Sequence, residues 1–419
     1  MIKYLLSSFG VVLIFSCTPT SSLDRYSLKG TEEILSFPVI EEARMPQNSV
    51  FLFKEKGENY LSFQNLPKSE ILIYSMKSQS LIKRLCLNTE GNNSVLGGFG
   101  GYYIADMEHI FIPSIYVNTI FVVDTAGVVK RKMNYSKTKG GQVLIPFMPS
   151  DKCPMVFIGN ELYIPQTVNL RLGSEAIEKS PIKVVLDTIE NTVEALPMRF
   201  PSLINYKDFG TVGAFGAEYS CCYDGNRFIY SFNADEDLYL TTSAHGQIEK
   251  KKAKSKYLDN VTVFRSNEED FQRMVKAQCE HASYGKIVYD KYRDVYYRFA
   301  YPPCDASDYS GDYVELLRSG RKSFSILILD NQLNVVGETS FPAYTYNPNL
   351  SFILEDGLYV SLNHIKNPDY SDDILRFQKL ELKEIGKSFC EAGIAVVMVA
   401  TAVAAVGGAI TGTIMSGGA

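Results

Sequence analysis

GNRFIYS at residues 225–231 is one of six similar segments that together decide the fold of this 419-residue chain. Each segment begins with a polar turn and continues as a short run rich in aromatic and β-branched residues, which is typical of a β-strand. The other five are GENYLSF (57–63), MEHIFIP (107–113), GNELYIP (159–165), YRDVYYR (292–298) and EDGLYVS (355–361). Their equivalent apolar positions lie 50, 52, 66, 67 and 63 residues apart, which indicates a repeat architecture.

A second strand-like run follows each segment. These runs are ILIYS (71–75), IFVVD (120–124), IKVVLD (182–187), LYLTT (238–242), SILILD (325–330) and ILRFQKLEL (374–382). Several of them lead through a turn into a third alternating run, such as VVKRK (128–132) and NVVGE (334–338). Strands joined by turns at this spacing resemble a propeller blade of four antiparallel strands.

The pattern therefore predicts an all-β fold, a six-bladed β-propeller over residues 30–387. A blade must bury its sheet faces on its neighbours, and a closed ring satisfies all six. We expect residues 33–37 to pair beside residues 374–382 and so close the ring. A pair of two-sheet β-sandwiches is the alternative. The main helical pattern before residue 388 covers residues 266–279, with Asn267 as its expected N-cap.

The N-terminus has the shape of a secretory signal peptide, because an apolar run at residues 4–15, too short to span a bilayer, follows Lys3. Ile14-Phe15-Ser16-Cys17 resembles the lipobox of bacterial lipoproteins, and this resemblance implies that Cys17 is lipidated after cleavage. We expect a signal peptide over residues 1–16 and a lipidated tether over residues 17–29. The alternative is an ordinary signal peptide with Cys17 unmodified.

Together with the repeats, this N-terminus resembles uncharacterised bacterial lipoproteins that carry a six-bladed-propeller-like domain of unknown function. The resemblance covers roughly residues 30–385 and implies no reaction. It implies a membrane-anchored protein of the bacterial cell envelope. The first acidic residue after the lipobox is Asp24, so a periplasm-facing location is favoured over the cell surface.

The C-terminal residues 388–419 are predicted to form an apolar, Gly/Ala-rich helical tail. Residues 393–415 carry no charge and are long enough to cross a bilayer, and Gly408 and Gly412 form a GxxxG pattern. Lysines precede this segment and no cation follows it, which is opposite to the positive-inside rule for a periplasmic domain. We expect a helix that associates with a membrane or with another copy, the alternative being packing against the propeller.

Composition excludes several classes of function. The net charge is −5 without a strong basic block, so a nucleic-acid partner is not expected. The four histidines lie far apart, and the acids at 305, 308, 312 and 315 lack EF-hand spacing, so neither a metal nor a cofactor is predicted. No nucleophile or zinc-hydrolase motif is present, and no catalytic residue can be assigned.

Seven cysteines besides Cys17 leave at least one thiol free if disulfides form. Cys279 and Cys304 are the predicted pair. Cys221 and Cys222 are neighbours in a predicted strand, so their side chains should point to opposite faces.

The richest local cluster is YDKYRDVYYRFAYPPCDASDYSGDY at residues 289–313. Its alternating tyrosines and arginines, together with a long insertion after Pro302-Pro303, predict a ligand-binding surface at Tyr297, Arg298, Tyr301 and Tyr309. The glycine-rich segment 97–101 fits no phosphate-binding motif, and we expect it to let the chain turn tightly near the channel.

These observations predict a lipid-anchored binding module for a partner protein, a peptide or a glycan, without identified catalysis. Two alternatives stay open. A glycan-acting hydrolase or lyase would carry carboxylates at the channel mouth, and a structural envelope subunit would need no site at all.

Overall fold

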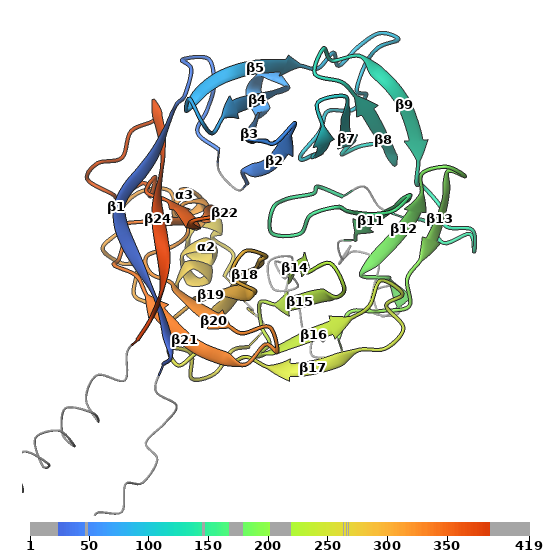
Figure 1. Cartoon of the computed structure of the whole chain (residues 1–419). Coiled ribbons are helices and arrows are strands. Elements are labelled where there is room, and N and C mark those ends of the chain that lie inside the picture. The colour runs from blue at the N-terminus through green and yellow to red at the C-terminus, as the bar shows by residue number, and fades with distance from the viewer. Residues whose placement is uncertain are drawn as a thin grey trace, which may run out of the picture. The chain divides into compact units, whose positions relative to one another are not determined.

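Six four-stranded antiparallel sheets stand around a central channel in the computed structural model (Figure 1). The structure describes residues 24–46, 49–144, 147–166, 179–201, 219–262, 264, 266 and 268–385. The predicted six-bladed β-propeller is confirmed, and the sandwich alternative is wrong. The predicted signal peptide, Cys17 and the apolar tail from residue 386 lie outside the described residues.

Blades 1 to 5 are each built from four consecutive strands that run in order from the channel to the rim, whereas blade 6 takes its outermost strand from the N-terminus (Figure 1). Blade 1 is β2 (Phe51–Glu55), β3 (Glu58–Asn65), β4 (Glu70–Ser75) and β5 (Ser80–Cys86), with the short 3₁₀ helix η1 (Leu66–Lys68) between β3 and β4. Blade 2 is β6 (Tyr103–Asp106), β7 (His109–Pro113), β8 (Thr119–Val123) and β9 (Val129–Asn134). Blade 3 is β10 (Val156–Ile158), β11 (Glu161–Pro165), β12 (Lys183–Asp187) and β13 (Thr192–Ala195).

Blades 4 to 6 complete the ring. Blade 4 is β14 (Tyr219–Tyr223), β15 (Phe228–Phe232), β16 (Asp237–Thr241) and β17 (Glu249–Lys252). Blade 5 is β18 (Ser283–Asp290), β19 (Val295–Tyr301), β20 (Ser325–Leu329) and β21 (Val335–Ser340). Blade 6 is β22 (Asn347–Leu354), β23 (Gly357–Ser361), β24 (Ile374–Glu384) and the N-terminal strand β1 (Tyr26–Pro38). The six repeated segments are therefore the second strands of the blades, and the runs that follow them are the third.

The ring is closed by the first strand of the chain. β1 pairs antiparallel with β24, and Leu35 lies opposite Phe377 in the register (Figure 1). The predicted closure is confirmed. Pairing extends back to Tyr26, which lies opposite Glu384, so the ring starts earlier than residue 30, where the sequence predicted its start.

The core lies between the blades rather than in one central mass. Six apolar clusters each join two neighbouring blades, so every sheet is covered on both faces. In β19, for example, Tyr296 packs into the cluster shared with blade 4, whereas Tyr297 packs into the cluster shared with blade 6. Strands buried on both faces read as continuous apolar runs instead of alternating ones, as in SILIL of β20.

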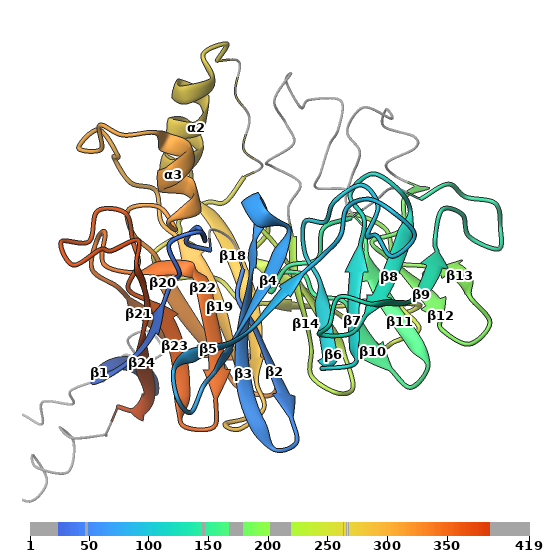
Figure 2. The same ribbon diagram turned by 90° about the horizontal axis from the view of Figure 1, so that it is seen from above.

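Two helices stand on one side of the ring (Figure 2). The predicted helix at 266–279 is α2 (Phe271–Glu280), and its N-cap is Asp270, whose side chain accepts from the backbone N–H of Arg273 at 2.8 Å. The cap expected at Asn267 lies outside the described residues. The second helix, α3 (Tyr313–Arg318), was not predicted and begins after the cap Asp312. No helix in the described part of the chain is long and apolar enough to cross a membrane.

Two of the four histidines are fully buried and neutral. Nδ1 of His245 donates to the carbonyl of Ser243 (2.8 Å), and its Nε2 accepts from the hydroxyl of Tyr230 (2.6 Å). Nε2 of His364 donates to the carbonyl of Arg321 at 2.7 Å. Burial lowers the pKa of each histidine to about 4, because desolvation disfavours the charged form.

We therefore expect stability to fall as the pH drops from about 6.5 towards 4. In that window the unfolded chain binds a proton at each site and the folded chain does not, so each histidine contributes a slope of about 1.4 kcal/mol per pH unit. Urea unfolding between pH 5 and 7.5 measures this slope. His245→Gln should reduce it, and a slope equal to that of the wild type would contradict the assignment.

The central channel as candidate functional site

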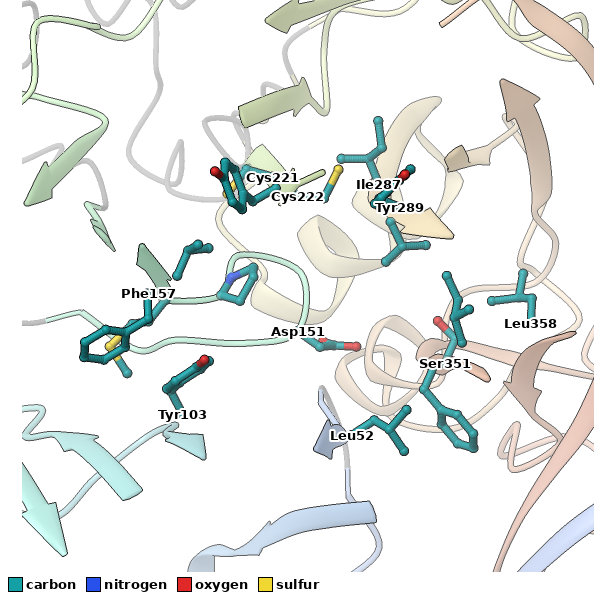
Figure 3. A pocket seen from close by; sticks show the side chains of 17 residues that line it. Leu52, Tyr103, Asp151, Phe157, Cys221, Cys222, Ile287, Tyr289, Ser351 and Leu358 are labelled. Carbon is teal, nitrogen blue, oxygen red and sulfur yellow. The ribbon is translucent and has the colours of Figure 1, made fainter. Parts of the chain in front are cut away.

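All six blades contribute to one pocket of about 420 Å³ in the channel (Figure 3). It is lined mainly by apolar and aromatic side chains from the innermost strands. The contributing residues include Leu52 on β2, Tyr103 on β6, Phe157 on β10, Tyr223 on β14, Tyr289 on β18 and Phe352 on β22. A largely apolar pocket with a few polar groups is the usual form of a small-ligand site.

The aromatic side chains of the pocket are held in place from behind. Four of them lie directly opposite a second ring on the next strand of their own blade, and such cross-strand pairs stabilise ring orientation. The pairs and the distances between their ring centroids are Tyr103–Phe111 (6.2 Å), Tyr223–Phe228 (4.7 Å), Tyr289–Tyr296 (4.9 Å) and Phe352–Tyr359 (5.3 Å). The rings therefore present fixed apolar faces to the channel.

One residue of this lining, Asp151, is charged, and it is paired with the buried Lys286. Oδ2 of Asp151 lies 2.5 Å from Nζ of Lys286, and its Oδ1 accepts from the hydroxyl of Ser49 at 3.1 Å. The side chains of the pair are 13% and 6% exposed. Burial raises the pKa of Asp151, and the Lys286 ammonium opposes this rise. The charge of Asp151 at the pocket wall is thus balanced by Lys286.

Ser351 adds an unsatisfied polar group next to the pair. Nζ of Lys286 also donates to the carbonyl of Ser351 at 3.3 Å. The serine is 4% exposed, and among the described residues its hydroxyl has no hydrogen-bond partner. A buried hydroxyl without a partner costs free energy. In Figure 3, Asp151 points across the pocket towards the strand that carries Ser351.

Asp151 reaches the channel on the loop between β9 and β10, which we call the channel loop. The backbone carbonyl of Lys152 accepts from the N–H of Cys221 (3.0 Å) and from the hydroxyl of Ser220 (2.7 Å), which attaches the loop to β14. The glycine-rich segment 97–101 runs against this loop: a Cβ on Gly101 would overlap the carbonyl oxygen of Pro149. Position 101 therefore requires glycine because the backbone approaches the channel loop closely, and not only because the chain turns as predicted.

Residues 26–340 match a protein family described as a domain of unknown function, DUF4221. The chain belongs to the DUF4221 family. A crystal structure of a DUF4221 member from Bacteroides vulgatus is 26% identical, covers 86% of this chain and 99% of its own, and superposes with a TM-score of 0.74. A Bacteroides fragilis protein is 10% identical over 88% of this chain and 98% of its own, with a TM-score of 0.49. No curated protein matches the chain.

In this DUF4221 chain, the four residues predicted to form a recognition surface are buried. Tyr297 and Arg298 are 0% exposed, and Tyr301 and Tyr309 are 8% and 7% exposed. The first three lie on β19, whose two faces are covered by neighbouring blades, and Tyr309 packs beneath α2 and α3. The prediction of an exposed surface at these positions is therefore wrong, because the aromatic run belongs to a strand that is covered on both faces.

Arg298 links two blades from inside the core. Its guanidinium donates to the carbonyls of Asp235 (2.6 Å), Glu236 (2.8 Å) and Ala253 (2.8 Å), and its Nε donates to the hydroxyl of Ser231 (2.9 Å). It also stacks on a ring of its own blade, with Cζ 3.5 Å from the ring centroid of Tyr284. Burial lowers the pKa of Arg298 to about 10. The arginine supports the fold and is not open to a ligand.

The predicted disulfide is also absent from the structure. Cys279 and Cys304 are free thiols, and Sγ of Cys304 lies 3.6 Å from the carbonyl oxygen of Cys279. Cys221 and Cys222 point to opposite faces as predicted, into the clusters on either side of blade 4. The described residues contain no group of three or more metal-ligating side chains.

Proposed function

We propose that this DUF4221 chain is a binding module that holds a small ligand without net charge in its central channel, with a glycan fragment as the first candidate. The observation that carries the proposal is the ring of fixed aromatic faces around a buried Asp151–Lys286 pair. Aromatic faces cover the apolar side of a ligand, and a few polar groups fix its orientation.

The charges of the pocket favour a neutral ligand. Asp151 is the one carboxylate among the described residues that line the pocket, and its charge is balanced by Lys286. An anion or a cation would have to disrupt this pair, and an unpaired buried charge is costly. A sugar hydroxyl can instead donate a hydrogen bond to the carboxylate of Asp151 without displacing Lys286.

The presence of a single carboxylate in the described lining also favours binding over hydrolysis. Most glycoside hydrolases use two carboxyl groups that flank the scissile bond, and the described lining supplies one. A purely structural subunit would not need the pocket.

Binding is tested by calorimetric titration of the purified full chain with neutral mono- and oligosaccharides and, in parallel, with zwitterionic dipeptides. We expect a sugar to bind, and Tyr289→Ala to weaken its affinity by about tenfold, or about 1.4 kcal/mol. Tyr116→Ala is the matched control, because Tyr116 is 75% exposed and does not line the pocket. If only the dipeptides bound, the ligand would be a zwitterionic peptide and not a glycan. If Tyr289→Ala and Tyr116→Ala bound the sugar with equal affinity, the binding site would lie outside the channel pocket.

We further propose that the module is anchored at the bacterial envelope, facing the periplasm, by a lipid on Cys17. The lipobox resemblance supports this proposal. Metabolic labelling with a clickable fatty acid should mark the wild type and leave Cys17→Ser unlabelled; labelling of both would overturn it.

A further inference from the structure

Two free cysteines lie next to each other where the channel loop meets the wall of the pocket. Cys153 lies on the loop that carries Asp151, and Cys221 lies on β14, which lines the channel. Their Sγ atoms are 3.7 Å apart. The backbone hydrogen bond from Cys221 to Lys152 (3.0 Å) holds the two segments side by side. The sulfurs therefore need to move little to form a bond, which has a length of about 2.05 Å.

A buried cation accompanies this pair. Nζ of Lys183 on β12 lies 3.5 Å from Sγ of Cys221, and Lys183 is 0% exposed. The S–H of Cys153 and the Lys183 ammonium lower the pKa of Cys221 against the effect of burial. Burial, together with the neighbouring Cys221 sulfur, raises the pKa of Cys153. Of the two thiols, Cys221 is thus the one that forms the thiolate, and thiolates are the reactive form.

We propose that Cys153 and Cys221 are a redox-active dithiol that closes to a disulfide and so ties the channel loop to blade 4. The oxidant is a small or protein disulfide, R–S–S–R. The partly exposed Cys153 takes the first step: its S–H gives its proton to the Cys221 thiolate 3.7 Å away as the Cys153 sulfur attacks one sulfur of R–S–S–R, forms a mixed disulfide and releases one RS⁻. The first RS⁻ takes this proton from Cys221. The Cys221 thiolate, beside Lys183, then attacks the Cys153 sulfur, breaks the mixed disulfide and releases the second RS⁻.

Atoms, protons and electrons balance in this reaction. Two protein thiols and one R–S–S–R give one protein disulfide and two R–SH, and the two protons given up by the cysteines are taken up by the two leaving thiolates. The protein sulfurs are oxidised by two electrons, and the donor disulfide is reduced by two. The product fixes the loop beside Asp151, so the redox state sets the mobility of one wall of the pocket.

The test uses the reduced full chain, equilibrated with excess oxidised glutathione and mapped by mass spectrometry after alkylation. We expect a linked peptide pair that contains Cys153 and Cys221, formed in the folded protein and absent in Cys153→Ser. Exposed Cys86 serves as an internal control, because it should carry glutathione and thereby show that the reagent is active. Free or separately glutathionylated Cys153 and Cys221, beside a modified Cys86, would overturn the proposal.

The role of Lys183 is tested by the pH dependence of closure. Lys183→Met should slow closure at pH 7 by about tenfold, and the rate should rise with pH more steeply than in the wild type, because without the ammonium the thiolate forms only at higher pH. A rate that is unchanged at pH 7 would remove Lys183 from the site. If Lys183→Met does not fold, the peptide map of the wild type still decides whether the two cysteines close. Because this map needs no ligand, its outcome is independent of the glycan titration.

Discussion

Replacing Arg298 with methionine should lower the free energy of unfolding by about 3–5 kcal/mol. The substitution keeps much of the side-chain volume but removes the donors to three backbone carbonyls of blade 4. A buried acceptor left without its donor costs about 1–3 kcal/mol. It also removes the stacking on Tyr284, so the expected loss lies at the upper end of single-residue effects.

Urea unfolding followed by circular dichroism measures the loss. Arg318→Met is the matched control, because Arg318 is exposed near the end of α3 and should change stability by less than about 0.5 kcal/mol. If Arg298→Met were as stable as this control, the blade-linking role would be wrong, and a functional role for Arg298 would have to be considered again.

The second large effect concerns the seam that closes the ring. Phe37 on β1 is 0% exposed and makes edge-to-face contacts with Tyr74 of blade 1 and Phe377 of β24, with ring centroids 5.9 and 6.1 Å apart. Phe37→Ala should therefore cost about 3–5 kcal/mol, through lost burial and the cavity left behind.

The matched control lies on the same strand. Ile34 is 42% exposed, so Ile34→Ala should cost less than about 1 kcal/mol. Thermal unfolding of the two variants compares them directly. Equal and small effects would mean that the pairing of β1 with β24 adds little to the stability of the ring.

The repeat was visible in the sequence because the second and third strands of each blade are strongly patterned. Segments such as GNRFIYS and LYLTT combine aromatic and β-branched residues with polar turns, and they became β15 and β16. The closure was visible for the same reason, since residues 33–37 form a further strand-like run without a partner nearby in the sequence.

The site was not visible, in part because two of the strands that line it are very short. The innermost strands β6 and β10 have four and three residues, too few to show a period. Asp151 belongs to a loop, and its partner Lys286 lies more than a hundred residues away in the sequence. Only the ring topology brings them together.

The recognition surface was predicted at the wrong residues because β19 has a strong sequence pattern but is covered on both faces. Tyrosine and arginine in the run VYYRFAY are typical of binding sites, but here they fill the space between stacked sheets. Exposure cannot be deduced from alternation when both faces of a strand are covered. A buried strand and a binding strand then have the same composition.

The position of a bound neutral sugar in a crystal structure tests the central claim most directly. We predict that the sugar lies in the channel, within hydrogen-bond distance of Asp151 and against at least one of the rings of Tyr223, Tyr289 and Phe352. A sugar bound instead on the side that carries α2 and α3, or along the outer strands, would contradict the assignment of the channel as the functional site.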